Sequence, residues 1–158
     1  MCIRDRYKDD RTGAIDLAFD PTDPRVVYAV LWQAQQGPWE NGSFTGPNSG
    51  LFKSTDGGDN WTQLTGGLPT FAQGLGRIGI GIAPSDGNRM YALVEARGGL
   101  GGLYRSDDAG ATWVRVNKEN RIYGRGSDFA CVRVDPKNQD VILSLIHISR
   151  PSPRPKCA

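Results

Sequence analysis

Apolar residues alternate with polar or small residues in three segments of the chain, residues 15–21, 78–84 and 130–136. Each alternating run ends in a proline, and apolar side chains stand two, four and six residues before it. A period of two is typical of a strand that buries one face, and the proline with its polar neighbours predicts a turn. We therefore expect three similar strands, each followed by a turn. The buried face of the first strand should consist of Ile15, Leu17 and Phe19.

The segments after these turns also resemble one another. A second apolar run follows each of the first two turns, and Tyr28-Ala29 in the first run matches Tyr91-Ala92 in the second. Shorter runs then predict a third and a fourth strand in each repeat. The strands expected after the turns are residues 26–32, 51–53 and 61–64 in the first repeat and residues 90–94, 103–105 and 113–116 in the second.

Four short antiparallel strands in a repeat of about 40–60 residues form the blade of a β-propeller. The pattern therefore predicts an all-β chain, a fragment of a β-propeller with two four-stranded antiparallel blades and part of a third. The blades should cover about residues 14–65 and 77–117, and the next blade should begin at about 129–142.

One polar turn occurs twice, as KSTDGGDNW at residues 53–61 and as RSDDAGATW at residues 105–113. The aspartate of each turn can accept hydrogen bonds from backbone N–H groups of its own loop, and the glycine permits a positive φ. The tryptophan is expected to enter the core between neighbouring sheets. The sequence therefore predicts a structural role, and neither catalysis nor metal binding, for Ser54, Asp56, Gly58 and Trp61 and for Ser106, Asp108, Gly110 and Trp113.

This spacing resembles the Asp-box, also called the bacterial neuraminidase (BNR) repeat, and departs from it at Asn60, where threonine is usual. With the YA pair and the DP turn, the blades resemble sortilin-like propellers and also propeller glycoside hydrolases of the xyloglucan-active kind. The resemblance covers nearly all of residues 11–142. It implies a propeller fold and an exported parent protein, and it discriminates poorly between activities.

In a four-stranded meander, the first and third turns lie at one end of the sheet. The proline turns and the polar turns should therefore share one face of the propeller, and the long connections should gather on the other. Binding residues concentrate on loops that a rigid scaffold holds, so we expect ligand contacts on the second face. The candidates there are Trp39, Glu40, Phe44, Glu95, Arg121, Tyr123, Arg125 and Asp128.

Each candidate also has a plainer interpretation. Trp39 beside Glu40 can stack on a sugar ring or grip a peptide side chain, but Trp39 can equally cover the edge of the blade. A lone glutamate at a strand end, such as Glu95, is usually solvated. The charged stretch at 121–128 can recognise a carboxylate, or it can be a solvent-exposed loop without a ligand. The connection 65–77 offers Phe71 and Arg77, although a linker between blades explains it as well.

Two functions follow from the pattern. The first is a non-catalytic binding scaffold for a peptide, a protein or a glycan. The alternative is a fragment of a glycoside hydrolase that acts on a β-glucan or xyloglucan-like polysaccharide. Glycoside hydrolysis needs two carboxyl groups about 5–9.5 Å apart; Glu40, Glu95 and Asp128 offer such groups, and nothing in their spacing selects a pair. The fragment itself is expected to be inactive.

The ends of the chain read as one short DNA word translated on both strands, which resembles the transposase end sequence of sequencing libraries. On this interpretation residues 1–6 and 143–158 are adapter translation, and the natural sequence covers about residues 7–142. The single histidine, His147, then belongs to the adapter and not to the natural sequence. Of the three cysteines, Cys131 alone lies in the natural sequence, and we expect it to be a small core residue. A Ser-His-Asp triad, a Cys/His pair and a zinc cluster therefore lack parts.

Composition narrows the partners further. The net charge is +2 and 38% of the residues are hydrophobic, which does not favour nucleic-acid binding. The apolar runs are too short to span a bilayer. We expect no cofactor and no metal, a peptide, protein or carbohydrate ligand, contacts to the remaining blades of the parent protein, and an extracellular or periplasmic location.

Overall fold

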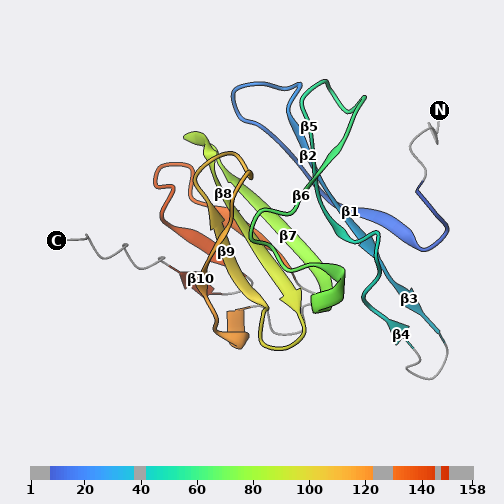
Figure 1. Cartoon of the computed structure of the whole chain (residues 1–158). Helices are drawn as coiled ribbons and strands as arrows, with labels where there is room; N and C mark the ends of the chain where they lie inside the picture. Colours follow the sequence, from blue (N-terminus) through green and yellow to red (C-terminus); the bar gives the residue numbers. More distant parts are fainter. Residues whose placement is uncertain (1–7, 38–41, 123–129, 145–146, 150–158) are drawn as a thin grey trace.

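The computed structural model of the chain describes residues 8–37, 42–122, 130–144 and 147–149. Its strands form three antiparallel sheets and one small hairpin, and the other regular elements of the described residues are short 3₁₀-helices (Figure 1). The expectation of an all-β chain with two four-stranded sheets and part of a third is confirmed. Within these residues no helix has the length and apolar character that a membrane span requires.

The sheets follow the order of the repeats. The first sheet has the strand order β1-β2-β5-β6, with β1 (Thr12–Phe19), β2 (Val27–Gln33), β5 (Gly50–Ser54) and β6 (Thr62–Leu64). The second sheet has the order β10-β9-β8-β7, with β7 (Leu75–Ala83), β8 (Asp86–Ala96), β9 (Gly102–Ser106) and β10 (Val114–Asn117). The third sheet consists of β11 (Val132–Val134), β12 (Ile142–Ser144) and β13 (His147–Ser149). A small hairpin pairs β3 (Gln35–Gln36) with β4 (Gly42–Ser43), and the short helices are η2 (Phe71–Gln73) and η3 (Asn120–Ile122).

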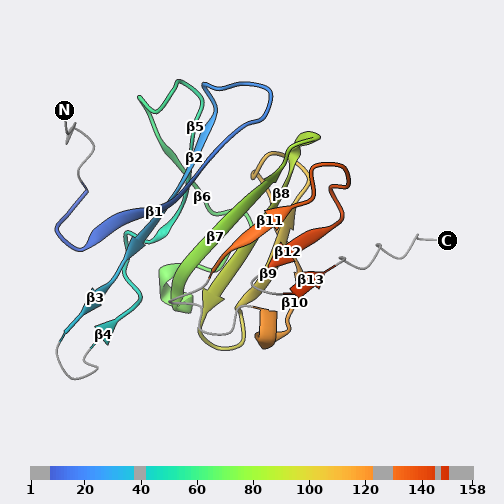
Figure 2. The same cartoon turned by 180° about the vertical axis from the view of Figure 1, so that it is seen from behind.

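The sheets pack face to face, and the first strands β1, β7 and β11 lie next to one another (Figure 2). The apolar layer between the first and second sheets includes Tyr28, Val30, Leu51, Ile78, Ile80, Met90, Tyr104 and Trp113. The layer between the second and third sheets includes Tyr91, Leu93, Leu103, Ile122, Val132 and Ile142. Because apolar burial is the main favourable contribution to folding, each sheet depends on its neighbour for stability.

The tyrosine that repeats in β2 and β8 explains part of this packing. Tyr28 and Tyr91 are fully buried. The hydroxyl of Tyr28 donates to the carbonyl of Ala109 at 3.1 Å, and that of Tyr91 donates to the carbonyl of Gln139 at 2.8 Å. Each tyrosine therefore covers the next sheet with its ring and bonds a turn of that sheet with its hydroxyl. Burial raises the pKa of Tyr28 to about 12.

The predicted buried face of β1 is wrong. Leu17 and Phe19 are 54% and 59% exposed, whereas Ile80 at the position that matches Leu17 is only 2% exposed. A bulge between Ala14 and Asp16 inserts Ile15 as an extra residue, which inverts the alternation at that point. Ile15 consequently packs toward the second sheet, and Leu17 and Phe19 point away from it, where none of the described residues covers them.

Cys131 is exposed, contrary to the expected core position. Cys131 directly precedes β11, and the next residue, Val132, is the one that is buried against the second sheet. The assignment of residues 1–6 and 143–158 to adapter translation stays a prediction; β12 ends and β13 lies inside the second of these segments.

The first strands of neighbouring sheets contact one another in two different ways. Asp16 Oδ2 of β1 accepts a hydrogen bond from the backbone N–H of Ile80 in β7, at 3.0 Å. Gly79, at the position in β7 that matches Asp16, instead lies against the main chain that leads into β11. A Cβ atom at Gly79 would lie 1.5 Å from the carbonyl oxygen of Ala130, so only glycine fits there.

Candidate functional site

The connections divide between the two ends of the sheets. We call residues 54–61 and 106–113 the Ser-Asp-Gly-Trp turns. The N–H of Gly57 donates to the carbonyl of Arg25 at 2.8 Å, and the N–H of Ala109 donates to that of Asn88 at 3.0 Å, so each turn bonds the proline turn of its own sheet. The long connections lie at the opposite end (Figure 1). We call this end the long-loop face; its described residues are 33–37, 42–49, 65–77, 96–101 and 117–122.

The first Ser-Asp-Gly-Trp turn is closed by its own side chains. Ser54 Oγ donates to Asp56 Oδ1 at 2.7 Å and accepts from the N–H of Gly58 at 2.8 Å. Asp56 accepts from the backbone N–H of Asn60 at 2.9 Å and from its side-chain amide at 2.7 Å. Trp61 Nε1 donates to the carbonyl of Gly58 at 2.9 Å. These bonds close the loop without a partner outside it.

The second turn repeats the same bonds. Ser106 Oγ donates to Asp108 Oδ1 at 2.7 Å and accepts from the N–H of Gly110 at 2.9 Å. Asp108 accepts from the N–H of Thr112 at 2.8 Å and from its hydroxyl at 2.5 Å, and Trp113 Nε1 donates to the Gly110 carbonyl at 2.9 Å. Asn60 therefore takes the place of Thr112, because both side chains present a donor to the carboxylate.

The hydrogen bonds of each turn act on its carboxyl group. The bonds from Thr112 hold the pKa of Asp108 below its ordinary value of 3.8, and those from Asn60 lower the pKa of Asp56 in the same way. A carboxylate that stays charged and accepts bonds only from its own loop suits turn formation better than proton transfer. The structural role of these aspartates stays a prediction, and their geometry favours it.

The two tryptophans differ, which corrects one expectation. Trp113 is 4% exposed and packs between the first and second sheets, where its backbone N–H donates to the carbonyl of Gly66 at 2.7 Å. Trp61 is 36% exposed and does not enter a core between sheets. Trp113 points away from the third sheet and toward the first sheet, which precedes its own sheet in the stack. Trp61 has the same position in the first sheet, and none of the described residues forms a sheet that could cover it.

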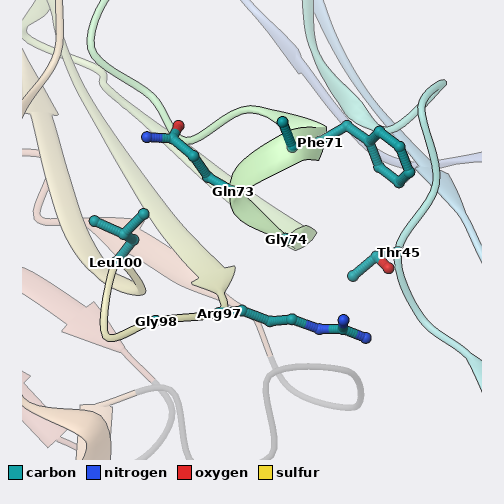
Figure 3. A pocket seen from close by; sticks show the side chains of 8 residues that line it. Thr45, Phe71, Gln73, Gly74, Arg97, Gly98 and Leu100 are labelled. Carbon is teal, nitrogen blue, oxygen red and sulfur yellow. The ribbon is translucent and has the colours of Figure 1, made fainter.

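A pocket of about 450 Å³ opens on the long-loop face between the first and second sheets. Figure 3 shows the ring of Phe71 and the side chain of Arg97 extending toward the segment that holds Thr45, while Gly98 and Leu100 lie on the far side. Three separate connections therefore build one pocket. Its lining residues are Thr45, Phe71, Ala72, Gln73, Gly74, Arg97, Gly98 and Leu100.

Local bonds hold Phe71 at the rim of this pocket. The backbone N–H of Thr70 donates to the side-chain oxygen of Gln73 at 2.9 Å, which caps η2. Gly74 ends η2 with a φ of 74°, a left-handed conformation that favours glycine. Its carbonyl then accepts from the N–H of Arg97 at 3.2 Å. These bonds tie the connection that carries Phe71 to the one that carries Arg97.

A stack of side chains lies on the same face. The rings of Trp32 and Phe44 lie 6.1 Å apart and nearly parallel, and Trp32 Nε1 donates to the Phe44 carbonyl at 2.9 Å. The guanidinium of Arg77 lies 5.6 Å from the centre of the Trp32 ring, within the range of a cation–π contact. Glu95 Oε2 accepts from the backbone N–H of Arg77 at 3.4 Å. The stack thus links the predicted candidates Phe44 and Glu95 through Trp32 and Arg77.

A second, more polar hollow of about 200 Å³ adjoins the pocket and shares Thr45 with it. Gln33 lines this hollow, and its side-chain oxygen accepts from the N–H of Asn48 at 3.1 Å. The hydroxyl of Ser49 accepts from the N–H of Gln33 at 2.9 Å. The two hollows extend the concave surface from the second sheet across to the β3–β4 hairpin.

Of the predicted candidates that the structure describes, Phe44, Glu95 and Arg121 do not line this pocket. The guanidinium of Arg121 forms an ion pair with Glu119 Oε2 at 3.0 Å, and the Arg121 side chain is 82% exposed. Both observations fit the interpretation of this stretch as a solvent-exposed loop. Trp39, Glu40, Tyr123, Arg125 and Asp128 lie outside the described residues. No three His, Cys, Asp or Glu side chains gather closely enough to hold a metal ion in the part of the chain that the structure describes. Four lining residues were not predicted from the sequence, namely Thr45, Gln73, Arg97 and Leu100. The one feature of the sequence that could have indicated a binding site here is Arg97, which lies in a Gly-rich connection.

Comparisons with curated proteins relate the chain to xyloglucanases; no family model matches it. A xyloglucanase of Paenibacillus sp is 34% identical over 113 residues, which cover 68% of this chain and 10% of the relative. An oligoxyloglucan-reducing end-specific xyloglucanase of Emericella nidulans is 37% identical over 92 residues, 56% of this chain and 11% of the relative. Xyloglucanase Xgh74A of Acetivibrio thermocellus is 35% identical over 128 residues, 74% of this chain and 14% of the relative.

Solved structures show the same fold. A GH74 enzyme of Niastella koreensis matches with a TM-score of 0.57 at 20% identity, covering 92% of this chain and 22% of that one. An ancestral GH74 enzyme matches with a TM-score of 0.53 at 19% identity, covering 80% of this chain and 15% of that one. The likeness to these GH74 propellers confirms that the stacked sheets are a propeller fragment.

The chain spans only 10–14% of the length of the curated relatives it matches. The matches favour the glycoside hydrolase alternative, and they give no support to the non-catalytic, sortilin-like scaffold that was the first of the two hypotheses.

Proposed function

We propose that this chain is part of a propeller glycoside hydrolase that acts on xyloglucan or a related β-glucan, and that its long-loop face contacts the polysaccharide. The observation that carries the proposal is the similarity to three xyloglucanases. The parent enzyme would act outside the cell, because a polysaccharide does not cross a membrane unaided.

The pocket supplies groups of the kind that sugars need. A pyranose ring has an apolar face that packs on aromatic side chains and hydroxyls that need hydrogen-bonding partners. Phe71 is 48% exposed and lines the pocket together with the polar side chains of Arg97, Thr45 and Gln73. Phe44, which precedes Thr45 in the sequence and does not line the pocket, is 38% exposed on the same face. The volume of about 450 Å³ falls in the range of about 300–1,000 Å³ that is usual for ligand sites.

The chain is proposed to contribute binding and no complete catalytic centre. Cleavage requires one carboxyl group as acid and another as base or nucleophile. Glu95, one of the three predicted carboxylates, lies near the end of β8. Its possible partners Glu40 and Asp128 lie outside the described residues, so we assign no catalytic pair.

We also infer that the two Ser-Asp-Gly-Trp turns are Asp-boxes, a finer assignment than the fold itself. The identical hydrogen bonds of the two turns support it, including the use of Asn60 in the role of Thr112. In this proposal they stabilise the blades and take no part in cleavage.

Binding of the full chain to soluble xyloglucan tests the proposal. Affinity electrophoresis should show retardation by xyloglucan, and none by starch. Phe71→Ala and Arg97→Ala should each weaken binding about three- to tenfold, as expected for loss of one aromatic or charged contact of about 1 kcal/mol. Val114→Ala is the matched control, because Val114 is 56% exposed but follows the second Ser-Asp-Gly-Trp turn at the other end. Equal mobility with and without xyloglucan would overturn the proposal.

A further inference from the structure

Each of the two adjoining hollows on the long-loop face contains one arginine, and no acidic residue is among the described residues that line them. Arg97 is the charged residue of the pocket of about 450 Å³, and Arg11 is that of the polar hollow of about 200 Å³. The hollows share Thr45, so they form one concave surface with two positive charges. Such a surface favours an anionic ligand.

Neither arginine is neutralised within the part of the chain that the structure describes. Its ion pairs between described residues do not include Arg97 or Arg11, although four other arginines pair with an aspartate or a glutamate, namely Arg25, Arg89, Arg105 and Arg121. Glu95 precedes Arg97 by two residues, but its Oε2 turns to Arg77 and accepts from the Arg77 N–H at 3.4 Å. The positive charge of the pocket is therefore left for a ligand.

The carboxylate of Asp9, close to Arg11 in the sequence, is occupied by other donors. It accepts from the backbone N–H of Arg11 at 2.8 Å, from the hydroxyl of Thr12 at 2.9 Å and from the side-chain amide of Asn48. The carbonyl of Arg11 accepts from the N–H of Ala34 at 3.1 Å. These bonds fix the main chain of Arg11 and leave its guanidinium at the hollow.

The stem of Arg97 is held so that its guanidinium enters the pocket. A Cβ atom at Gly74 would lie 2.6 Å from Cγ of Arg97, so the stem lies directly on the main chain of Gly74. The carbonyl of Arg97 accepts from the N–H of Leu100 at 3.2 Å, which closes the turn behind it. The guanidinium and the ring of Phe71 both extend toward the segment that holds Thr45 (Figure 3). A positive charge and an aromatic ring therefore meet the same bound group.

A uronic acid has the chemistry that these two groups recognise. Its pyranose ring has an apolar face that packs on an aromatic side chain. Its carboxylate lies at the edge of that ring, where a guanidinium can donate two parallel hydrogen bonds. A neutral hexose has a hydroxymethyl group in the same place, which forms a weaker bond with a cation.

The charge of the whole face agrees with this ligand. The described residues of the long-loop face include the basic residues Arg77, Arg97, Lys118 and Arg121 and one acid, Glu119. The proline turns and the Ser-Asp-Gly-Trp turns at the opposite end hold more acidic than basic residues. An anionic polymer is therefore attracted to the long-loop face and repelled from the other end.

We propose that the pocket takes a carboxylate-bearing sugar unit, a uronic acid, of the polysaccharide. Its carboxylate pairs with Arg97 and its ring packs on Phe71, and Arg11 meets a second carboxylate further along the same polymer. This inference rests on the proposed function, because it names the chemical class of the ligand for the same site.

Two forms of one polymer test the proposal with the full chain. Soluble xyloglucan is compared with the same xyloglucan after oxidation of its primary hydroxyls to carboxylates, so the backbone stays constant and the charge changes. Biolayer interferometry on the two immobilised polymers gives two dissociation constants. We expect about five- to tenfold tighter binding of the oxidised form at low salt, and a smaller preference at about 200 mM salt, where charges are screened.

The variant Arg97→Gln should reduce this preference, measured as the ratio of the two dissociation constants, to less than about twofold. Arg121→Gln is the matched control. It removes the same charge from the same face, but Arg121 pairs with Glu119 and does not line the pocket, so the preference should persist. Arg11→Gln should reduce it in part. Thermal unfolding checks that each variant is folded, which is expected because Arg97, Arg121 and Arg11 are exposed.

The outcomes separate this proposal from the proposed function. Equal binding of both polymers, or equal loss of the preference in Arg97→Gln and Arg121→Gln, would overturn the uronic-acid site alone. Equally tight binding of carboxymethyl dextran would also overturn it, because the face would then attract any polyanion. Binding of the oxidised form alone would support the site and contradict a contact with neutral xyloglucan, and binding of neither polymer would contradict both proposals.

Discussion

The first and second sheets carry the same sequence pattern but differ in what surrounds them. Both Ser-Asp-Gly-Trp turns have the same internal bonds, yet Trp113 is buried and Trp61 is exposed. Ile80 is buried and its counterpart Leu17 is exposed. The comparison separates what a blade builds by itself, which is the turn, from what it obtains from a neighbouring blade, which is a covered apolar face.

The largest loss of stability is expected at Gly79 of the second sheet, because the neighbouring main chain leaves no space for a side chain there. Gly79→Ala should destabilise the chain by about 3 kcal/mol or more, because a Cβ would lie 1.5 Å from the carbonyl oxygen of Ala130 and the main chain would have to move. Gly13→Ala in β1 should change stability by less than about 0.5 kcal/mol, since nothing lies within 4 Å of its Cβ position. Urea unfolding of both variants measures the difference. Similar midpoints would show that β7 and β11 do not touch as described.

The two tryptophans offer the next contrast. Trp113→Ala should cost about 3–5 kcal/mol, because it leaves a cavity between two sheets. Trp61→Ala should cost on the order of 1 kcal/mol, because the ring already contacts water. Equilibrium unfolding followed by circular dichroism avoids the change in tryptophan fluorescence. Equal losses would contradict the different surroundings of the two rings.

The serines of the turns should instead behave alike. Ser54→Ala and Ser106→Ala each remove a buried hydroxyl that accepts a backbone N–H bond, and each should cost about 1–3 kcal/mol. Ser85→Ala, in an exposed turn, is the control and should stay within about 0.5 kcal/mol. The same unfolding experiment applies. A large loss at Ser106 with none at Ser54 would mean that the turn depends on its neighbour after all.

The smallest effect is a dependence on pH. The pKa values of Asp56 and Asp108 are lowered in the folded chain, so the stability that they contribute is present above the ordinary value of 3.8 and is lost as pH falls through the lower folded values. Both groups are exposed, so screening by solvent keeps the contribution small. The melting temperature of the Asp56→Asn/Asp108→Asn variant should therefore fall less between pH 6 and pH 3 than that of the original chain. Parallel profiles would mean that neither carboxylate gains from its turn.

Local sequence was enough to predict the turns. Ser, Asp, Gly and Trp of each turn lie within eight residues of one another, so their hydrogen bonds need no distant partner. The repeat of Tyr28 and Tyr91 likewise predicted equivalent strands, and the structure adds the reason, a hydroxyl that bonds the following sheet. The placement of the long connections at one end followed from the order of four antiparallel strands.

The tertiary structure decided the faces and the pocket. A single bulge turned Ile15 toward the second sheet, and a period of two in the sequence cannot reveal an extra residue in a pair of strands. Leu17 and Phe19 are exposed for another reason, because none of the described residues forms a sheet on their side of β1. The pocket joins Thr45, Phe71 and Arg97 from three connections, which become neighbours only when the first two sheets pack together. The sequence by itself thus determined which residues bond within each repeat, because those bonds span a few residues. Which apolar faces are buried depended on the packing of whole sheets, because burial is a property of the neighbour as much as of the strand.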